Sequence, residues 1–126
     1  MRAGIGMDSL RRAKRNLDAL YSIEYNGFMY SIKPLPEFSQ WLAEIKDGMT
    51  KRRLARRLEK AQLGNLEDVK AIGEGVFEMR EHFGPGWRMY YAKRGAILIV
   101  MLGGGEKSTQ AGDIAKALHL AATLED

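Results

Sequence analysis

Residues 76–102, with the sequence VFEMREHFGPGWRMYYAKRGAILIVML, decide the fold of this 126-residue chain. The stretch contains three strand-like runs, Val76 to Arg80, Trp87 to Lys93 and Ala96 to Leu102. A Gly-Pro-Gly turn separates the first pair of runs, and Arg94-Gly95 separates the second pair. Because strands joined by such short links pair as antiparallel neighbours, the stretch predicts a three-stranded meander.

The residues before the meander predict one more strand and a helical hairpin. The segment MYSIK (residues 29–33) alternates like a short strand and is followed by two prolines. A first helix is expected from Pro36 to about Asp47. Its core-facing side chains are Phe38, Trp41, Leu42 and Ile45. A second helix is expected between Gly48 and Gly64. Its core-facing side chains are Leu54, Leu58 and Ala61. The stretch from there to the meander is expected to be irregular.

A final helix is expected after the meander, and the order of all these elements indicates the fold class. This helix begins near Ser108 or Thr109. Its apolar side chains at helical spacing are Ile114, Ala117, Leu118 and Ala121. A run of strands between helices is typical of an α+β fold. We therefore predict a small antiparallel sheet, made of the N-terminal strand and the meander, with a helical hairpin and a C-terminal helix on one face.

The composition excludes several classes of protein. The chain has no cysteine, which rules out disulfides, thiolate nucleophiles and cysteine-based metal sites and favours a reducing compartment. Its longest apolar run, Ala96 to Leu102, is seven residues, far short of a membrane span. His82 and His119 have no carboxylate at metal-ligand spacing, so we expect neither a metal nor a cofactor. We expect a cytoplasmic protein with no membrane partner.

Positive charge is concentrated in one predicted helix. The net charge of the chain is +4, whereas KRRLARRLEK, residues 51–60, carries six basic residues against Glu59 alone. Such a run is often only a solvated helix face. Its density favours binding to the phosphates of an RNA instead. The candidate RNA-binding residues are Lys51, Arg52, Arg53, Arg56 and Arg57.

Strand alternation places polar side chains of neighbouring strands on one face. Side chains at i and i+2 share a face, so Glu78 and Arg80 lie opposite the apolar Phe77 and Met79 on their strand. On the next strand, Arg88 and Tyr90 lie opposite the second apolar set, formed by Trp87, Met89 and Tyr91. This polar face is either solvated or a phosphate site, since guanidinium groups match phosphate oxygens in pairs.

The segment LGGGEKSTQ, residues 102–110, links the last strand to the last helix. It does not match the phosphate-binding P-loop, because Glu106 precedes Lys107 where that loop needs glycine. Lys107 and hydroxyl groups still stand at a helix N-terminus, where unpaired N–H groups favour an anion. The alternative is a flexible link to an N-capped helix.

Five motifs together resemble the RelE/ParE superfamily of bacterial toxins, in particular the HigB-like killer proteins of type II toxin–antitoxin addiction modules. The resemblance covers Met29 to about Ala121. The motifs are FSQWLAEIKD, the basic helix ending in QLGN, GEGVFEMR, GPGWRMYYAKRG and GGGEKSTQAGDIAKA. Residues 29–126 are therefore expected to form the toxin domain. Residues 1–28 would be an N-terminal extension with a candidate helix opening at Asp8, and Met29 is itself a candidate native start.

The resemblance implies an α+β toxin that is inhibited by a cognate helix-turn-helix antitoxin and that cleaves mRNA on the ribosome. By position, Arg80, Arg88 and Lys107 match basic residues that relatives place around the scissile phosphate. Metal-independent cleavage uses the ribose 2′-OH as nucleophile, and Tyr90, Lys107 or His82 would assist proton transfer. Two alternatives stay open, a ParE-like inhibitor of DNA gyrase and a plain RNA-binding domain.

Overall fold

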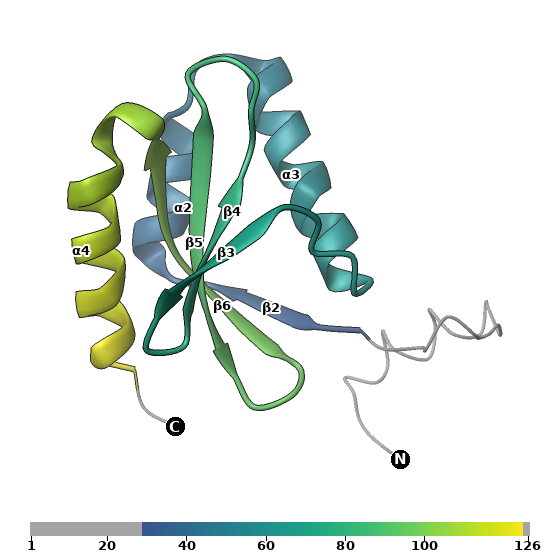
Figure 1. Ribbon diagram of the computed structural model, residues 1–126. Helices are drawn as coiled ribbons and strands as arrows, with labels where there is room; N and C mark the ends of the chain where they lie inside the picture. The colour runs from purple at the N-terminus through teal and green to yellow at the C-terminus, as the bar shows by residue number, and fades with distance from the viewer. Residues whose placement is uncertain (1–28, 125–126) are drawn as a thin grey trace, which may run out of the picture.

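The computed structural model describes residues 29–124. The helix expected to open at Asp8 lies outside the described residues. The described part of the chain forms five strands, three α-helices and one short 3-10 helix, shown in Figure 1. In chain order they are β2 (Ser31–Pro34), α2 (Pro36–Glu44), α3 (Gly48–Gln62), β3 (Val69–Gly73), β4 (Val76–Arg80), β5 (Trp87–Arg94), β6 (Leu98–Glu106), η1 (Lys107–Thr109) and α4 (Gln110–Ala122).

The strands form a single sheet in the order β2-β6-β5-β4-β3. The predicted meander is confirmed, since β4 pairs antiparallel with β5 and β5 with β6. The N-terminal strand departs from the prediction, because β2 runs parallel to β6, with Ser31 opposite Leu98. Parallel pairing follows from the intervening elements, which return the chain to the far edge of the meander. The sheet is therefore mixed, and the α+β fold class is confirmed.

A fifth strand, β3, occupies the stretch that was expected to be irregular. It pairs antiparallel with β4, and Glu74 and Gly75 form the turn between them with φ angles of 55° and 78°. Two successive residues with positive φ are typical of a two-residue hairpin turn. Gly73 and Gly75 thus belong to a tight hairpin. From the sequence, these glycines indicated an irregular segment.

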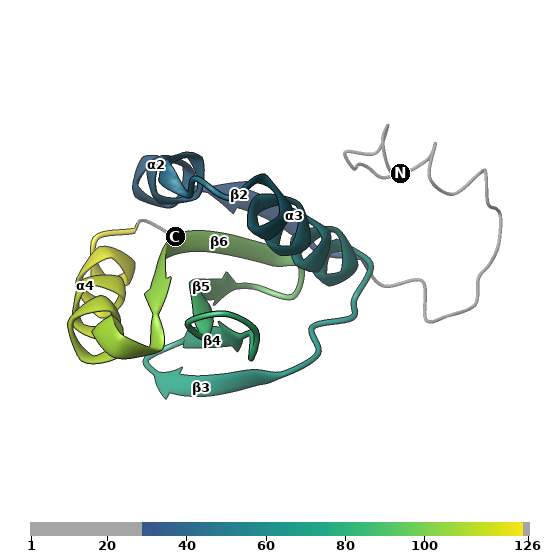
Figure 2. The same ribbon diagram turned by 90° about the horizontal axis from the view of Figure 1, so that it is seen from above.

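The helices cover both faces of the sheet, which corrects the expectation that they pack on one face. Figure 2 shows α2 and α3 together on one side of the sheet and α4 apart from them. On the α2 and α3 side the core contains Phe38, Leu54, Met79, Met89, Tyr91 and Met101. On the α4 side it contains Val76, Tyr90, Ala92, Val100, Leu102, Ala117 and Ala121. Strands buried on both faces carry apolar side chains at successive positions, which explains the uninterrupted run in β6.

The turn between α2 and α3 differs slightly from the sequence expectation. Helix α2 begins with Pro36 in its first turn, as predicted, but it ends at Glu44. Asp47 instead caps α3, because its carboxylate accepts hydrogen bonds from the Thr50 amide at 3.2 Å and the Thr50 hydroxyl at 2.7 Å. These hydrogen bonds lower the pKa of Asp47. The cap fixes the direction in which the basic helix leaves the turn.

Two features are absent from residues 29–124. None of the described helices has the length and apolar character needed to cross a membrane. Within the same residues, His, Asp and Glu side chains nowhere form a group of three or more that could hold a metal ion.

Candidate functional site

The polar face predicted from strand alternation exists. Arg80 of β4 lies directly opposite Arg88 of β5, and Glu78 lies opposite Tyr90. Their apolar neighbours on these strands pack on the α2 and α3 side, as expected. The sheet thus brings two arginines, one carboxylate and one phenol together on the face that α4 covers.

This polar face is largely buried, so the solvated-face interpretation is wrong. Glu78 and Tyr90 are fully buried, and Arg88 is only 6% exposed. The start of α4 closes over them, and Gln110 Nε2 donates a 2.7 Å hydrogen bond to Glu78 Oε2. Arg88 Nε lies 3.9 Å from the same carboxylate oxygen. Arg88 is therefore held by an internal ion pair and is not part of a solvated face.

One end of Arg88 reaches the turn between β4 and β5. Its Nη1 atom donates to the carbonyl oxygens of Glu81 at 3.0 Å and Trp87 at 3.1 Å. Within residues 29–124, Nη2 makes no hydrogen bond, so this nitrogen remains available to an anion.

Lys107 and Arg88 flank the same turn glycine. A Cβ atom placed on Gly86, which has φ of +81°, would lie 3.2 Å from Lys107 Cβ and 3.5 Å from Arg88 Nη1. The amide of Lys107 donates to the Gly86 carbonyl at 2.9 Å, which ties the two segments together. Glycine at position 86 therefore avoids a close contact with these two positively charged side chains.

Arg80 is more exposed than Arg88, since one-third of its side chain is accessible to solvent. Its Nη2 and Nε atoms donate to Asp68 Oδ1 at 2.9 and 3.3 Å. His82 Nε2 lies 2.6 Å from the other carboxylate oxygen of Asp68. The hydrogen bonds from His82 and from Arg80 lower the pKa of Asp68. One carboxylate therefore joins an arginine of the predicted site to the histidine of the turn.

Tyr90 does not lie at the surface of this site. Its side chain is fully buried and its hydroxyl has no hydrogen-bond partner within residues 29–124. Burial, and then the nearby charge of Glu78, raise the pKa of Tyr90 well above its ordinary value. The phenol keeps its proton at neutral pH and is not accessible to a substrate in this conformation. Its position fits packing under α4 better than proton transfer.

Most of the basic side chains of α3 point away from the sheet. Arg52, Arg53 and Arg56 are exposed and Lys51 is partly exposed. A hollow of about 440 Å³, here called the basic hollow, is lined by Met49, Arg52, Arg53, Arg56, Arg57, Lys60, Glu67 and Glu81. The guanidinium of Arg53 stacks 3.6 Å above the ring of Phe83, in the β4–β5 turn. The basic helix therefore contacts the turn that precedes Arg88.

Arg57 differs from the other basic residues of α3 because its side chain is only 4% exposed. Nη1 donates to the Arg80 carbonyl at 2.9 Å and forms a short ion pair with Glu81. Nη2 donates to the carbonyls of Leu66 at 3.0 Å and Asp68 at 2.8 Å. The guanidinium of Arg57 therefore does not belong to a solvated helix face. Arg57 ties α3 to the two segments that carry Asp68 and Arg80.

Sequence reasoning missed the residues that orient the arginines. Asp68 lay in the stretch expected to be irregular, and Gln110 was not distinguished from its neighbours. For Glu78 a signal existed, since alternation placed it on the face of Arg80 and Arg88. A carboxylate between two arginines on one face is a natural ion-pair partner.

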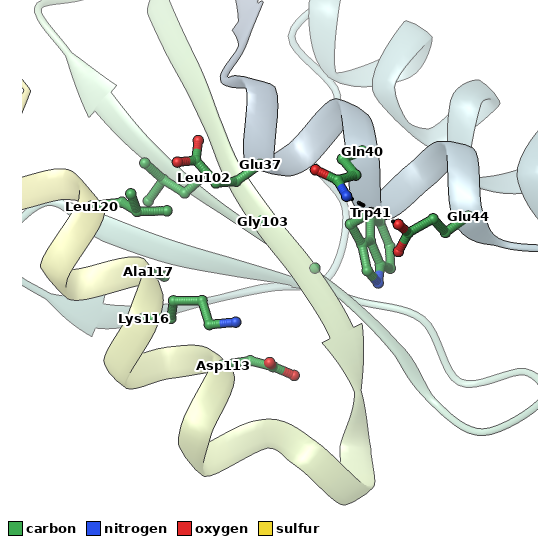
Figure 3. A pocket seen from close by; sticks show the side chains of 11 residues that line it. Glu37, Gln40, Trp41, Glu44, Leu102, Gly103, Asp113, Lys116, Ala117 and Leu120 are labelled. Atoms are coloured by element: carbon green, nitrogen blue, oxygen red, sulfur yellow. Dashed lines mark hydrogen bonds between the residues drawn. The ribbon is translucent and has the colours of Figure 1, made fainter.

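A second hollow, of about 290 Å³, lies between α2 and α4 (Figure 3). Gly103 and Gly104 of β6 form part of its lining, and Trp41 projects from α2 beside them. A Cβ atom on Gly104 would lie 2.5 Å from the Trp41 ring, so glycine is required there for close packing. None of the predicted site residues lines this hollow.

Comparison with known proteins identifies a relative by sequence and a neighbour by structure. No protein-family model matches the sequence. An uncharacterized protein of Haemophilus influenzae is 38% identical over 93 residues, which are 74% of this chain and 94% of that protein. A double arginine-to-alanine mutant of the Escherichia coli toxin RelE, solved in the free state, superposes with a TM-score of 0.59 at 12% identity. That match covers 74% of this chain and 98% of the toxin chain. The chain therefore belongs to the family of the Haemophilus influenzae protein, and its fold is that of the toxin RelE.

Proposed function

We propose that this protein is the toxin of a type II toxin–antitoxin module and acts in the cytoplasm as a metal-independent, ribosome-dependent mRNA endoribonuclease. Two findings support the proposal, the RelE-like fold and a cationic site on that fold. The observation that carries it is the placement of the Lys107 and Arg88 side chains beside Gly86, within 3.5 Å of where its Cβ atom would lie, with Arg80 opposite Arg88 on the neighbouring strand.

This arrangement suits the stabilisation of a phosphate that gains negative charge. When a ribose 2′-oxygen attacks the adjacent phosphorus, the phosphate becomes pentacovalent and its oxygens become more negative. In the proposed complex, Arg88 Nη2 and the Lys107 ammonium donate to those oxygens. Arg88 is held in place beforehand by Glu78 and by two carbonyls, so little reorganisation accompanies the reaction. The Lys107 ammonium also protonates the leaving 5′-oxygen.

The exposed side chains of α3 supply the second part of the proposal. Lys51, Arg52, Arg53 and Arg56 would contact RNA phosphates on the ribosome, whereas Arg57 serves the fold. Contacts of this kind release counterions, so binding weakens steeply as salt increases. Replacing Arg52, Arg53 and Arg56 by glutamine should reduce ribosome co-sedimentation and its salt dependence together. Unchanged co-sedimentation would identify this face as merely solvated.

Lys107→Met tests the catalytic part of the proposal, with Lys116→Met as the matched control on an exposed lysine of α4. The assay adds purified protein to translating ribosomes and maps the ends of mRNA fragments. Wild type should give fragments that end in a 2′,3′-cyclic phosphate. Lys107→Met should cleave about a hundredfold to a thousandfold more slowly, the usual loss for one donor to a transition-state oxyanion. Lys116→Met should cleave at the wild-type rate.

The same assay separates the proposal from its alternatives. A wild-type protein that never cleaves mRNA but induces a DNA-damage response in cells would favour inhibition of DNA gyrase. A protein that binds RNA without cleaving it would favour a plain RNA-binding domain. Growth arrest that is suppressed by a helix-turn-helix protein encoded beside this gene would support the proposed antitoxin partner.

A further inference from the structure

We propose that His82 is the general base of this cleavage and that Asp68 is the residue that positions it, an inference that rests on the proposed RNA cleavage. His82 Nε2 lies 2.6 Å from Asp68 Oδ2. The histidine belongs to the same turn as Gly86, and Asp68 also holds Arg80. A histidine oriented by a carboxylate, next to a group that binds phosphate, is the arrangement that proton abstraction requires.

The carboxylate of Asp68 is fixed from several directions. Its Oδ1 atom accepts hydrogen bonds from Arg80, so Oδ2 is directed to His82. Its backbone carbonyl accepts from the Arg80 amide at 3.0 Å and from Arg57 Nη2 at 2.8 Å. The Asp68 carboxylate therefore bridges the side chains of Arg80 and His82.

The hydrogen bond to Asp68 decides which nitrogen of His82 is basic. An ionised carboxylate only accepts hydrogen bonds, so the neutral imidazole must carry its proton on Nε2. The lone pair is then on Nδ1, which makes no hydrogen bond within residues 29–124. The His82 side chain is 70% exposed, so an incoming ribose can reach it. Asp68 thus orients the imidazole through Nε2, and Nδ1 remains accessible to a substrate.

The turn also places His82 next to the groups that receive the phosphate. Arg88 Nη1 donates to the carbonyl of Glu81, the residue before His82. In the proposed step, Nδ1 takes the proton of the 2′-OH, the 2′-oxygen forms a bond to phosphorus, and the bond from phosphorus to the 5′-oxygen breaks. The Lys107 ammonium gives its proton to the 5′-oxygen and regains one from water, while the His82 imidazolium releases one to water.

The charges around His82 act in both directions on its protonated form. Asp68 stabilises the imidazolium that forms in the step, whereas Arg80, held by the same carboxylate, opposes it. Other charged groups at this end of the sheet are Arg53 and Arg57 of α3, Glu78 of β4, Glu81 of the β4–β5 turn, Arg88 of β5 and Lys107 of η1.

Four proteins test the inference: wild type, His82→Ala, Asp68→Asn and, as the matched control, His119→Ala on the exposed side of α4. The assay measures the rate of mRNA cleavage on ribosomes at saturating protein, between about pH 5 and pH 9, the range over which histidine titrates. The wild-type and His119→Ala rates should rise with pH and then level off. His82→Ala should be about a hundredfold to ten-thousandfold slower and should lose this step.

Added imidazole provides a readout that a purely structural role would not move. Imidazole should restore part of the cleavage rate of His82→Ala, in proportion to the concentration of neutral imidazole. It should not restore Asp68→Asn, whose histidine is still present but no longer oriented. If rescue is absent, loss of the pH step in His82→Ala supports the inference and its persistence overturns it. A His82→Ala protein that cleaves within about threefold of wild type, when histidine bases ordinarily contribute far more, also overturns it.

Failure of the inference and failure of the proposed function give different results. If wild type cleaves and His82→Ala cleaves equally well, the site is a nuclease whose base lies elsewhere. If wild type never cleaves, the proposed function fails and His82 has no reaction to assist. Ribosome co-sedimentation of each variant shows whether a lost rate comes from lost binding, and a His82→Ala protein that loses binding in step with its rate contradicts a role in proton transfer.

Discussion

Replacing Arg57 by alanine should destabilise this protein more than the same change at any other basic residue of α3. The side chain is 4% exposed and connects α3 to two separate segments of the sheet. It donates to the carbonyls of Leu66, Asp68 and Arg80 and pairs with the carboxylate of Glu81. Alanine would remove every one of these contacts, and of the three carbonyls the one of Asp68 would keep the Arg80 amide as a donor.

The magnitude follows from what is left unpaired. Breaking a buried ion pair by removing one partner costs about 3–5 kcal/mol. A buried acceptor left without a donor costs about 1–3 kcal/mol. Glu81 is 19% exposed, so water replaces part of the lost pairing. We therefore expect the free energy of unfolding to fall by about 3–5 kcal/mol in total, close to the value for the ion pair alone.

Urea unfolding followed by circular dichroism measures this loss. With a typical denaturant dependence of about 1–3 kcal/mol per molar urea, the midpoint should fall by at least about 1 M. Arg56→Ala is the matched control, since Arg56 is exposed on the same helix, and it should change stability by no more than about 0.5 kcal/mol. Arg57→Lys should recover only part of the loss, because an ammonium lacks the planar fork that reaches both segments. Equal midpoints for Arg57→Ala and Arg56→Ala would refute this account of the contacts.

Gly104→Ala should destabilise the fold by about 1–3 kcal/mol, since its Cβ would lie 2.5 Å from the Trp41 ring, whereas Gly103→Ala should be tolerated, and thermal unfolding of the pair checks this. The contribution of Asp68 to the free energy of unfolding should be complete above about pH 4 and should be lost as pH falls further, because the pKa of Asp68 is lowered in the folded protein. Asp68→Asn should therefore show a flatter loss of stability on acidification, and parallel curves for the two proteins would contradict the assignment. Residues 29–126 expressed alone should arrest growth like the full chain, because the resemblance to the toxin family begins at Met29. A soluble but harmless fragment beside a toxic full chain would show that the domain boundary is wrong.

Part of the candidate site could be predicted from local patterns. Alternation in VFEMR and WRMYYAK placed Arg80 and Arg88 on one face, and the register of β4 and β5 confirms this. Side chains two residues apart on a strand must share a face, whatever the rest of the chain does. The same alternation could not predict exposure, because a polar face is solvated only if nothing covers it. Here α4 covers it, and Arg88 is buried.

Local patterns in the sequence predict the meander, the apolar stripes of α2 and α3, and the concentration of positive charge on α3. These depend on neighbouring residues and on the periods of strand and helix, which act over a few positions. Three features depend on tertiary packing. Strand β2 pairs parallel with β6, Arg57 connects α3 to two other segments of the chain, and Asp68 joins Arg80 to His82. Arg57 and Arg80 are 23 positions apart and Asp68 and His82 are 14 apart. Contacts over such separations depend on how the helices and strands pack against one another. The sequence around an arginine is the same whether its guanidinium faces water or three carbonyls.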